Sequence, residues 1–130
     1  AVALANLQIF EDEKILEHVR TNEPAFRAAL DDLADLPIVG DIRGAGYFYG
    51  IELVKDRTDR LSFSDEEREH LLRWFLSNRL LALGPICRAD DRGEPVVQLS
   101  PPLIAGPDEF SEITSKPRQA PTEAMAEVGM

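Results

Sequence analysis

Arg88 is the residue whose type and position best suit chemistry on a charged substrate. It follows Gly84, which is expected to end a helix, and it stands in a short predicted strand behind Ile86 and Cys87. A guanidinium stays positively charged at physiological pH and offers a planar fork of donors that matches a carboxylate. From the residues alone, Arg88 is a candidate carboxylate-binding residue, and a plain surface arginine is the alternative interpretation.

The other titratable residues do not form the pattern of a catalytic site. His18 and His70 fall on separate predicted helices, and no serine or cysteine is spaced to act with them as a nucleophile. The adjacent aspartates at 31–32 and 90–91 point in different directions, as is typical of a helix end or a turn. We therefore expect no catalytic residue within this chain.

A glycine-rich stretch is the remaining candidate for a binding site. Gly40, Gly44 and Gly46 lie between two apolar runs that read as strands. A phosphate loop needs a helix N-terminus directly after the glycines, and no such helix pattern follows. These glycines are better explained by a positive φ angle or by close approach of the backbone.

Charge and composition exclude several classes of protein. The chain has 14 Lys and Arg against 24 Asp and Glu, a net charge of −10, which argues against a nucleic-acid-binding surface. Cys87 is the single cysteine, so we expect no disulfide, no zinc site and a cytoplasmic location. No apolar run reaches the length of a membrane span. The chain begins at Ala1 within an apolar pattern, which predicts a fragment of a longer protein.

The first part of the chain is predicted to be helical. Apolar spacing over residues 1–20 fits an opening helix, either continuous or divided in two. A second helical pattern follows Thr21 and Asn22, which offer caps, with Pro24 in its first turn. This pattern ends before Pro37, because the residue preceding a proline is pushed out of the α region.

Two strand pairs and a capped helix are predicted for the middle of the chain. Residues 38–53 read as two strands joined by a glycine-bearing turn or bulge. Ser64 and Glu67 have the spacing of a capping box and predict a helix from Ser64 to about Leu83. Residues 86–99 then read as a second hairpin that places Arg88 near one end.

The C-terminal part predicts one more helix and then an irregular segment. Pro107 is suited to the first position of a helix, and Ile113 is the last convincing core residue. Because Pro117 and Pro121 disfavour a helix, residues 114–130 are predicted to be an irregular or disordered tail. The whole order predicts an α+β domain over residues 1–113, with helices on one face of a small, largely antiparallel sheet.

Three stretches carry a resemblance to a known family. In order and spacing, the chain resembles class III aminotransferases of the ω-transaminase group over roughly residues 1–113. The matching stretches are Ala1–Leu7, Ile38–Leu53, and the segment that runs from Ile86 through Arg88 and Val96–Leu99 to Ile104.

The resemblance implies a fold type I enzyme of two domains, usually a homodimer, whose large domain holds pyridoxal phosphate through a lysine. This chain is similar to the C-terminal small domain alone. The Schiff-base lysine has no matching position, and Lys14, Lys55 and Lys116 fall at unrelated places. We therefore expect pyridoxal phosphate in the full-length enzyme, none in this chain, and no catalysis by the chain alone.

The resemblance also gives Arg88 a role. The arginine at the matching position of the family commonly binds the substrate carboxylate and swings aside for an uncharged amine. The implied reaction moves an amino group between an amine or amino acid and a keto acid. The implied partners are the large domain, a second subunit and these small molecules, and neither nucleic acid nor a membrane is expected. The alternative is a free-standing α+β module for ligand binding or dimerisation, without catalysis.

Overall fold

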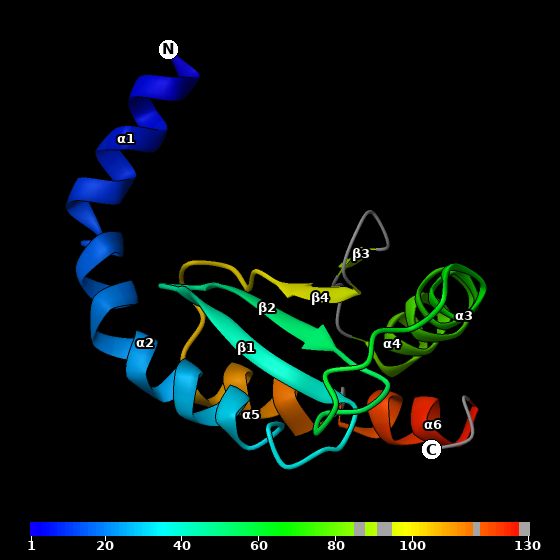
Figure 1. Cartoon of the computed structure of the whole chain (residues 1–130). Coiled ribbons are helices and arrows are strands. Elements are labelled where there is room, and N and C mark those ends of the chain that lie inside the picture. Colours follow the sequence, from blue (N-terminus) through cyan, green and yellow to red (C-terminus); the bar gives the residue numbers. More distant parts are fainter. Residues whose placement is uncertain (85–87, 91–94, 116–117, 128–130) are drawn as a thin grey trace.

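A computed structural model describes residues 1–84, 95–115 and 118–127, together with the backbone of residues 88–90 (Figure 1). Within these residues helices alternate with two pairs of antiparallel strands. In chain order the elements are α1 (Val2–Asp12), α2 (Ile15–Asp31), β1 (Val39–Ala45), β2 (Phe48–Leu53), α3 (Asp65–Arg68), the π-helix η1 (Glu69–Leu76), α4 (Ser77–Leu83), β3 (Arg88–Asp90), β4 (Val96–Leu99), α5 (Pro107–Ser115) and α6 (Gln119–Glu127).

The strands form one antiparallel sheet in the order β1-β2-β4-β3. Along β2 and β4, buried and unburied residues alternate, because successive side chains point to opposite faces. The buried rows include Ile42, Ile51 and Val97. Figure 1 shows α2 and α5 beneath the sheet, and Ile51 and Val97 also lie close to Leu76, Leu80 and Pro121 of η1, α4 and α6. The predicted α+β class, with helices on one face of a small antiparallel sheet, is confirmed.

Aromatic packing on Phe26 joins the helices to the sheet. This fully buried ring of α2 lies between Tyr47, Tyr49 and Phe110, at centroid separations of 5.7, 5.4 and 4.8 Å. The contacts with the two tyrosines are edge-on, an arrangement that is favourable for aromatic rings, and the contact with Phe110 is tilted. The Tyr47 hydroxyl also donates to the carbonyl of Ala105 at 2.9 Å, so the loop before α5 is held against the first hairpin.

The first hairpin confirms the predicted strand pair and shows why its glycines are needed. Gly46 begins the two-residue turn with φ +60°, and its amide donates to the Glu23 carboxylate of α2 at 2.7 Å. Gly44 has no room for a side chain, since a Cβ there would lie 2.1 Å from the carbonyl oxygen of Phe48. The register shifts between Val39 and Asp41, so the strand pair contains a bulge as well as a turn.

The opening helix is divided in two. Lys14 adopts a left-handed conformation with φ 51° and separates α1 from α2. The predicted helix start at Thr21 and Asn22 is wrong, because α2 runs from Ile15 to Asp31 and contains Pro24 in its interior. Burial of Phe26 on the continuous helix offsets the one backbone hydrogen bond that a proline removes.

The predicted helix after residue 64 is confirmed, with an unpredicted change of winding. Ser64 and Glu67 form the reciprocal capping box, and Gly84 ends the helix with φ 109°. Between these ends, η1 has π-helical winding, and the Ser77 hydroxyl donates to the carbonyl of Leu72 five residues earlier. Such widened turns depend on packing around the helix, which apolar periodicity does not report.

The expectation of an irregular tail over residues 114–130 is corrected. Thr114 belongs to α5, and α6 occupies Gln119–Glu127 with Ala120 and Ala124 fully buried. Pro121 is the third residue of α6, where the amide has no partner inside the helix, so the proline removes no bond. Pro117 and residues 128–130 lie outside the described residues.

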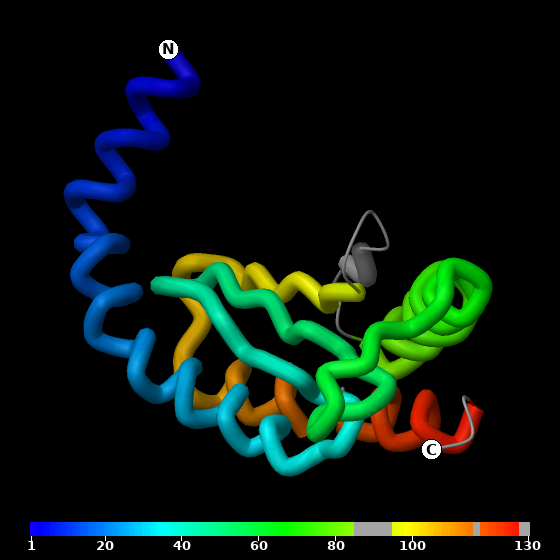
Figure 2. Tube along the Cα trace, viewed as in Figure 1, coloured from blue at the N-terminus to red at the C-terminus, as the bar shows by residue number. Residues whose placement is uncertain are grey.

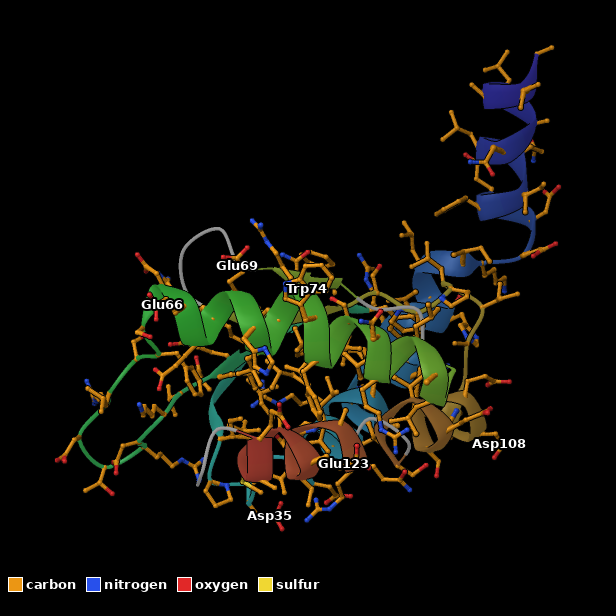
Figure 3. The ribbon with its side chains drawn as sticks, turned by 90° about the vertical axis from the view of Figure 1, so that its right-hand side faces the viewer. Asp35, Glu66, Glu69, Trp74, Asp108 and Glu123 are labelled. Carbon is orange, nitrogen blue, oxygen red and sulfur yellow. The ribbon has the colours of Figure 1, made fainter. Side chains whose placement is uncertain are left out.

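Charged side chains hold α6 against the helix that runs from α3 to α4. Both oxygens of Glu123 accept hydrogen bonds from Arg79, at 2.5 and 2.7 Å, and Glu127 lies 2.9 Å from His70. Figure 3 shows α6 alongside that helix, with Trp74 on the side turned away from it. Among the described helices, none is long and apolar enough to cross a membrane.

Substitution of Ala124 by Asp should detach α6. The new carboxylate would replace a fully buried methyl group, and an unpaired buried charge costs about 3 kcal/mol or more. Urea unfolding should show that loss of stability, and amide exchange should show loss of protection across α6. Ala126→Asp on the exposed side of α6 is the control, with a change within about 0.5 kcal/mol. Equal effects of the two substitutions would contradict the packing of α6.

Candidate functional site

Arg88 is the first residue of β3, at the edge of the sheet. Its backbone pairs with Gln98 of β4, Gln98 pairs with Gly50 of β2, and Gly50 pairs with Arg43 of β1. These four residues make one row across the sheet. The predicted hairpin that carries Arg88 is confirmed, while the side chain of Arg88 and residue Cys87 lie outside the described part of the chain.

This row belongs to the face of the sheet that the helices leave open. The neighbouring row contains Val97, Ile51 and Ile42, which are buried against the helices, whereas Gln98, Gly50 and Arg43 are partly or fully exposed. Rows alternate between the two faces with a period of two. The backbone register therefore places position 88 in a row of the open face.

Charged side chains occupy the β1 and β2 part of the open face. Arg43 forms ion pairs with Glu52 and, at 2.9 Å, with Asp41. The hydrogen bond to Glu52, followed by that to Asp41, raises the pKa of the Arg43 guanidinium. Phe48 lies on the same strands with 61% of its surface exposed. The open face thus presents paired charges and an unburied aromatic ring.

The two histidines have structural contacts and do not meet each other. His18 Nε2 lies 2.8 Å from the carbonyl oxygen of Ala105, and Asn22 lies on its other side. His70 contacts Glu127 on α6, as described above. Neither histidine has a hydroxyl or thiol partner among the hydrogen bonds of the described residues, so the geometry provides no nucleophile and base pair.

The aspartate pairs are likewise engaged in structure. Asp31 accepts from Arg27 at 2.9 Å, and the backbone carbonyl of Asp32 accepts from Arg118 at 2.5 Å. Asp90 is the last residue of β3, and Asp91 lies outside the described residues. Over the described ranges, no three His, Cys, Asp or Glu residues gather as metal ligands.

The described lysines do not fit a pyridoxal phosphate site. Lys14 is exposed at the break between α1 and α2, and Lys55 pairs with Glu67 at the start of α3. Lys14 is the N-cap of α2 but has no glycine-rich cradle beside it, and the helix start near Lys55 is already occupied by the capping box of Ser64 and Glu67, whereas a phosphate is commonly held by glycine-rich turns at a free helix N-terminus. Lys116 lies outside the described residues.

A cavity of about 450 Å³ lies between the end of α4, the loop after β4 and α5. Its wall is mainly apolar, formed by Pro102, Ile104 and Ile113, with Glu109 and Glu112 at its side. Glu109 is engaged as a helix cap, since its carboxylate accepts the amide of Gly106 at 2.8 Å. Sequence reasoning missed this cavity, because it forms only where segments from separate elements come together.

Comparison with known proteins gives the family. The class-III aminotransferase family matches residues 1–120 of the 130 residues. The chain belongs to the class-III aminotransferases. The predicted resemblance is confirmed at the level of this family.

Related class-III aminotransferases are several times longer than this chain. A Mycobacterium tuberculosis protein named as a probable aminotransferase is 55% identical over 95% of this chain and 26% of its own length. The putrescine–pyruvate aminotransferase of Pseudomonas aeruginosa is 34% identical over 98% of this chain and 27% of its own length. The chain thus spans about a quarter of these relatives.

Solved structures of class-III enzymes share the fold. The ω-transaminase of Pseudomonas jessenii in complex with PMP superposes with a TM-score of 0.84 at 33% identity, over 98% of this chain and 27% of that chain. The PMP-bound aminotransferase of Vibrio fluvialis gives a TM-score of 0.85 at 31% identity, again over 98% of this chain and 27% of that one. The fold of this chain therefore recurs in part of these transaminases.

The start of α3 should make stability depend on acid pH. The Lys55 ammonium and the Ser64 amide hold the pKa of Glu67 below its usual range. A carboxyl group whose pKa is lowered by folding stabilises the fold above its unfolded pKa of about 4.3, and this contribution is lost as the pH falls through the folded value.

Urea unfolding at pH 6 and at pH 3 measures this effect. Glu67→Gln keeps a side chain that suits the capping box and should reduce the difference in stability between the two pH values. Glu66→Gln, in the same exposed turn, is the control and should leave the difference unchanged. If both variants keep the full acid dependence, the ion pair of Glu67 does not contribute to it.

Proposed function

We propose that this chain is the C-terminal small domain of a pyridoxal-phosphate-dependent transaminase. The observation that carries the proposal is one of coverage: nearly all of the chain matches class-III aminotransferases, while about a quarter of each relative is matched. The described lysines do not fit a cofactor site, which agrees with a Schiff-base lysine outside this chain. The chain alone is then inactive, and the full-length protein carries the cofactor.

The reaction proposed for the whole protein transfers an amino group between an amine or amino acid and a keto acid. The proposal is supported by the similar proteins, which include a putrescine–pyruvate aminotransferase and an ω-transaminase in complex with PMP. Pyridoxal phosphate supplies the electron sink for this chemistry when bound. The small domain contributes binding and orientation of the substrate.

Arg88 is proposed as the residue that binds the substrate carboxylate. Two features support this role: its place on an edge strand of the sheet, and its place in a row of the open face. A guanidinium on an edge strand is reachable by a small molecule, and its fork of donors matches a carboxylate in two hydrogen bonds. Arg88 would thus distinguish amino acids and keto acids from simple amines.

The exposed apolar surface of α1, together with the open face of the sheet, is proposed to meet the large domain and a second subunit. Helix α1 has no buried residue, and its apolar side chains are exposed, Val2 by 85% and Leu4 by 72%. Figure 2 shows α1 extending away from the rest of the chain. Apolar surface of this kind marks an interaction site. A homodimeric enzyme in the cytoplasm, where the single Cys87 stays reduced, accommodates these features.

In the full-length enzyme, Arg88→Ala should weaken the binding of carboxylate substrates far more than the binding of simple amines. Loss of a charge-assisted fork costs about 1.5 to 3 kcal/mol of binding, which applies only to substrates that carry the carboxylate. Steady-state kinetics with a keto acid and with an uncharged amine measure the two effects. Arg20→Ala, an exposed arginine of α2, is the matched control. Equal losses for both substrate types would exclude the proposed role.

The 130-residue chain should form no stable covalent adduct with pyridoxal phosphate, because the cofactor lysine is proposed to lie elsewhere. Absorbance of the purified chain after incubation with the cofactor and gel filtration, with the mass of the borohydride-reduced protein, measures this. A reduced adduct at one lysine in full occupancy would overturn the small-domain proposal. That result would favour the alternative of a free-standing ligand-binding module.

A further inference from the structure

A short loop between β2 and α3 holds two arginines in a fixed backbone. Asp56 and Leu61 exchange backbone hydrogen bonds of 3.3 and 2.9 Å across the loop. The Asp56 carboxylate also accepts the amides of Thr58 and Asp59, at 2.7 and 2.9 Å. Such aspartate-capped turns order a loop from within. These hydrogen bonds stabilise the conformation of residues 56–61, here called the arginine loop.

Arg60 occupies a backbone conformation that suits glycine. Its φ of 52° lies in the left-handed region, which L side chains adopt at a cost. Backbone strain of this kind is concentrated at functional sites, where a side chain is needed in spite of the conformation. The folding of the loop does not require arginine at position 60, since a glycine would fit this φ more easily.

The guanidinium groups of the arginine loop are unpaired, in contrast to most arginines of this chain. Within the described residues, neither Arg57 nor Arg60 forms a hydrogen bond or an ion pair, although the chain carries 24 acidic residues. Other arginines pair with carboxylates, namely Arg27, Arg43, Arg68, Arg73, Arg79 and Arg118. Arg20 is also unpaired, but it lies on α2, away from this loop.

Both free arginines line the same surface cavity. This cavity has a volume of about 640 Å³ and lies between the arginine loop and the paired ends of β1 and β2, where it is lined by Asp41 and Glu52. Arg43 bonds to both carboxylates and so neutralises part of their charge. The loop itself also carries Asp56 and Asp59, so the charges around the cavity nearly balance, and the two cations that remain without a partner among the described residues are Arg57 and Arg60.

We propose that this cavity binds a small molecule through an oxyanion, either a phosphate or a carboxylate group, held between Arg57 and Arg60. Two guanidiniums can share the oxygens of one such group in charge-assisted hydrogen bonds. The open cavity leaves room for the rest of the ligand. The proposal does not rest on the transaminase reaction, and it assigns the chain a second kind of ligand contact beside Arg88.

Titration of the ¹⁵N-labelled 130-residue chain with inorganic phosphate and, separately, with acetate tests the proposal. Amide shifts should saturate across residues 55–62 with a Kd of about 1 mM, while sodium chloride at equal ionic strength should not reproduce them. Saturation with phosphate alone identifies a phosphoryl ligand, with acetate alone a carboxylate ligand, and with both a general oxyanion site. Saturation with neither anion overturns the proposal.

Three variants separate the site from a general effect of charge. Arg57→Gln and Arg60→Gln should each weaken binding about tenfold, since each removes one charge-assisted contact. Arg20→Gln removes the same charge at an unpaired, exposed position of α2 and should leave binding unchanged. Equal weakening by all three variants would show that only net charge matters and would overturn the site.

Arg60→Gly tests whether the strained backbone serves the ligand. Glycine relieves the left-handed conformation, so the Tm should not fall, while anion binding should weaken about tenfold. Failure of this variant to weaken binding would overturn the role of Arg60. These outcomes are independent of pyridoxal phosphate and of Arg88, so they do not bear on the proposed transaminase function.

Discussion

Burial of Phe26 is the interaction on which the arrangement of this chain depends. Its ring contacts two aromatic residues of the first hairpin and one of α5, so a single side chain joins three elements that are distant in sequence. This contact requires Tyr49 to face the helices, which fixes the alternation of β2. A shift of one residue would turn every side chain of that strand to the other face. The open face, and with it the row that contains Arg88, therefore follows from the packing of an aromatic ring on the opposite side.

The sequence predicted those elements whose signals are local. Ser64 and Glu67 lie three residues apart and bond to each other, so their helix start could be read without knowledge of the fold. The tail prediction failed at α6, where two small alanines supply the buried face and Pro121 falls in the one turn that tolerates it. Pro24 was predicted to lie in the first turn of a helix, but α2 begins at Ile15 and continues through Pro24, so that Phe26 is buried.

The candidate sites differ in the same way. Arg88 could be chosen as a candidate from its residue type. The role expected for it came from the resemblance of three stretches of sequence to a family. Its position in an open row, however, depends on pairing with β4 and β2, which no local pattern reports. The cavity beside the arginine loop could not be predicted from the sequence, because Arg57 and Arg60 belong to what looks like an ordinary charged turn. What distinguishes them is the absence of partners among the described residues and a backbone angle, and both are properties of the folded chain.

Lys14, with its left-handed backbone, connects two helices that are attached to the rest of the chain to very different degrees. Helix α2 is fastened to the sheet through Phe26, whereas α1 buries none of its residues, so the dihedral angles near Lys14 set the angle between them. The 17 residues of α2 extend about 25 Å, so a rotation of about 10° at Lys14 would displace its far end by about 4 Å. If α1 is anchored elsewhere, that motion carries the sheet with it. A small change of torsion at Lys14 would then displace the open face of the sheet.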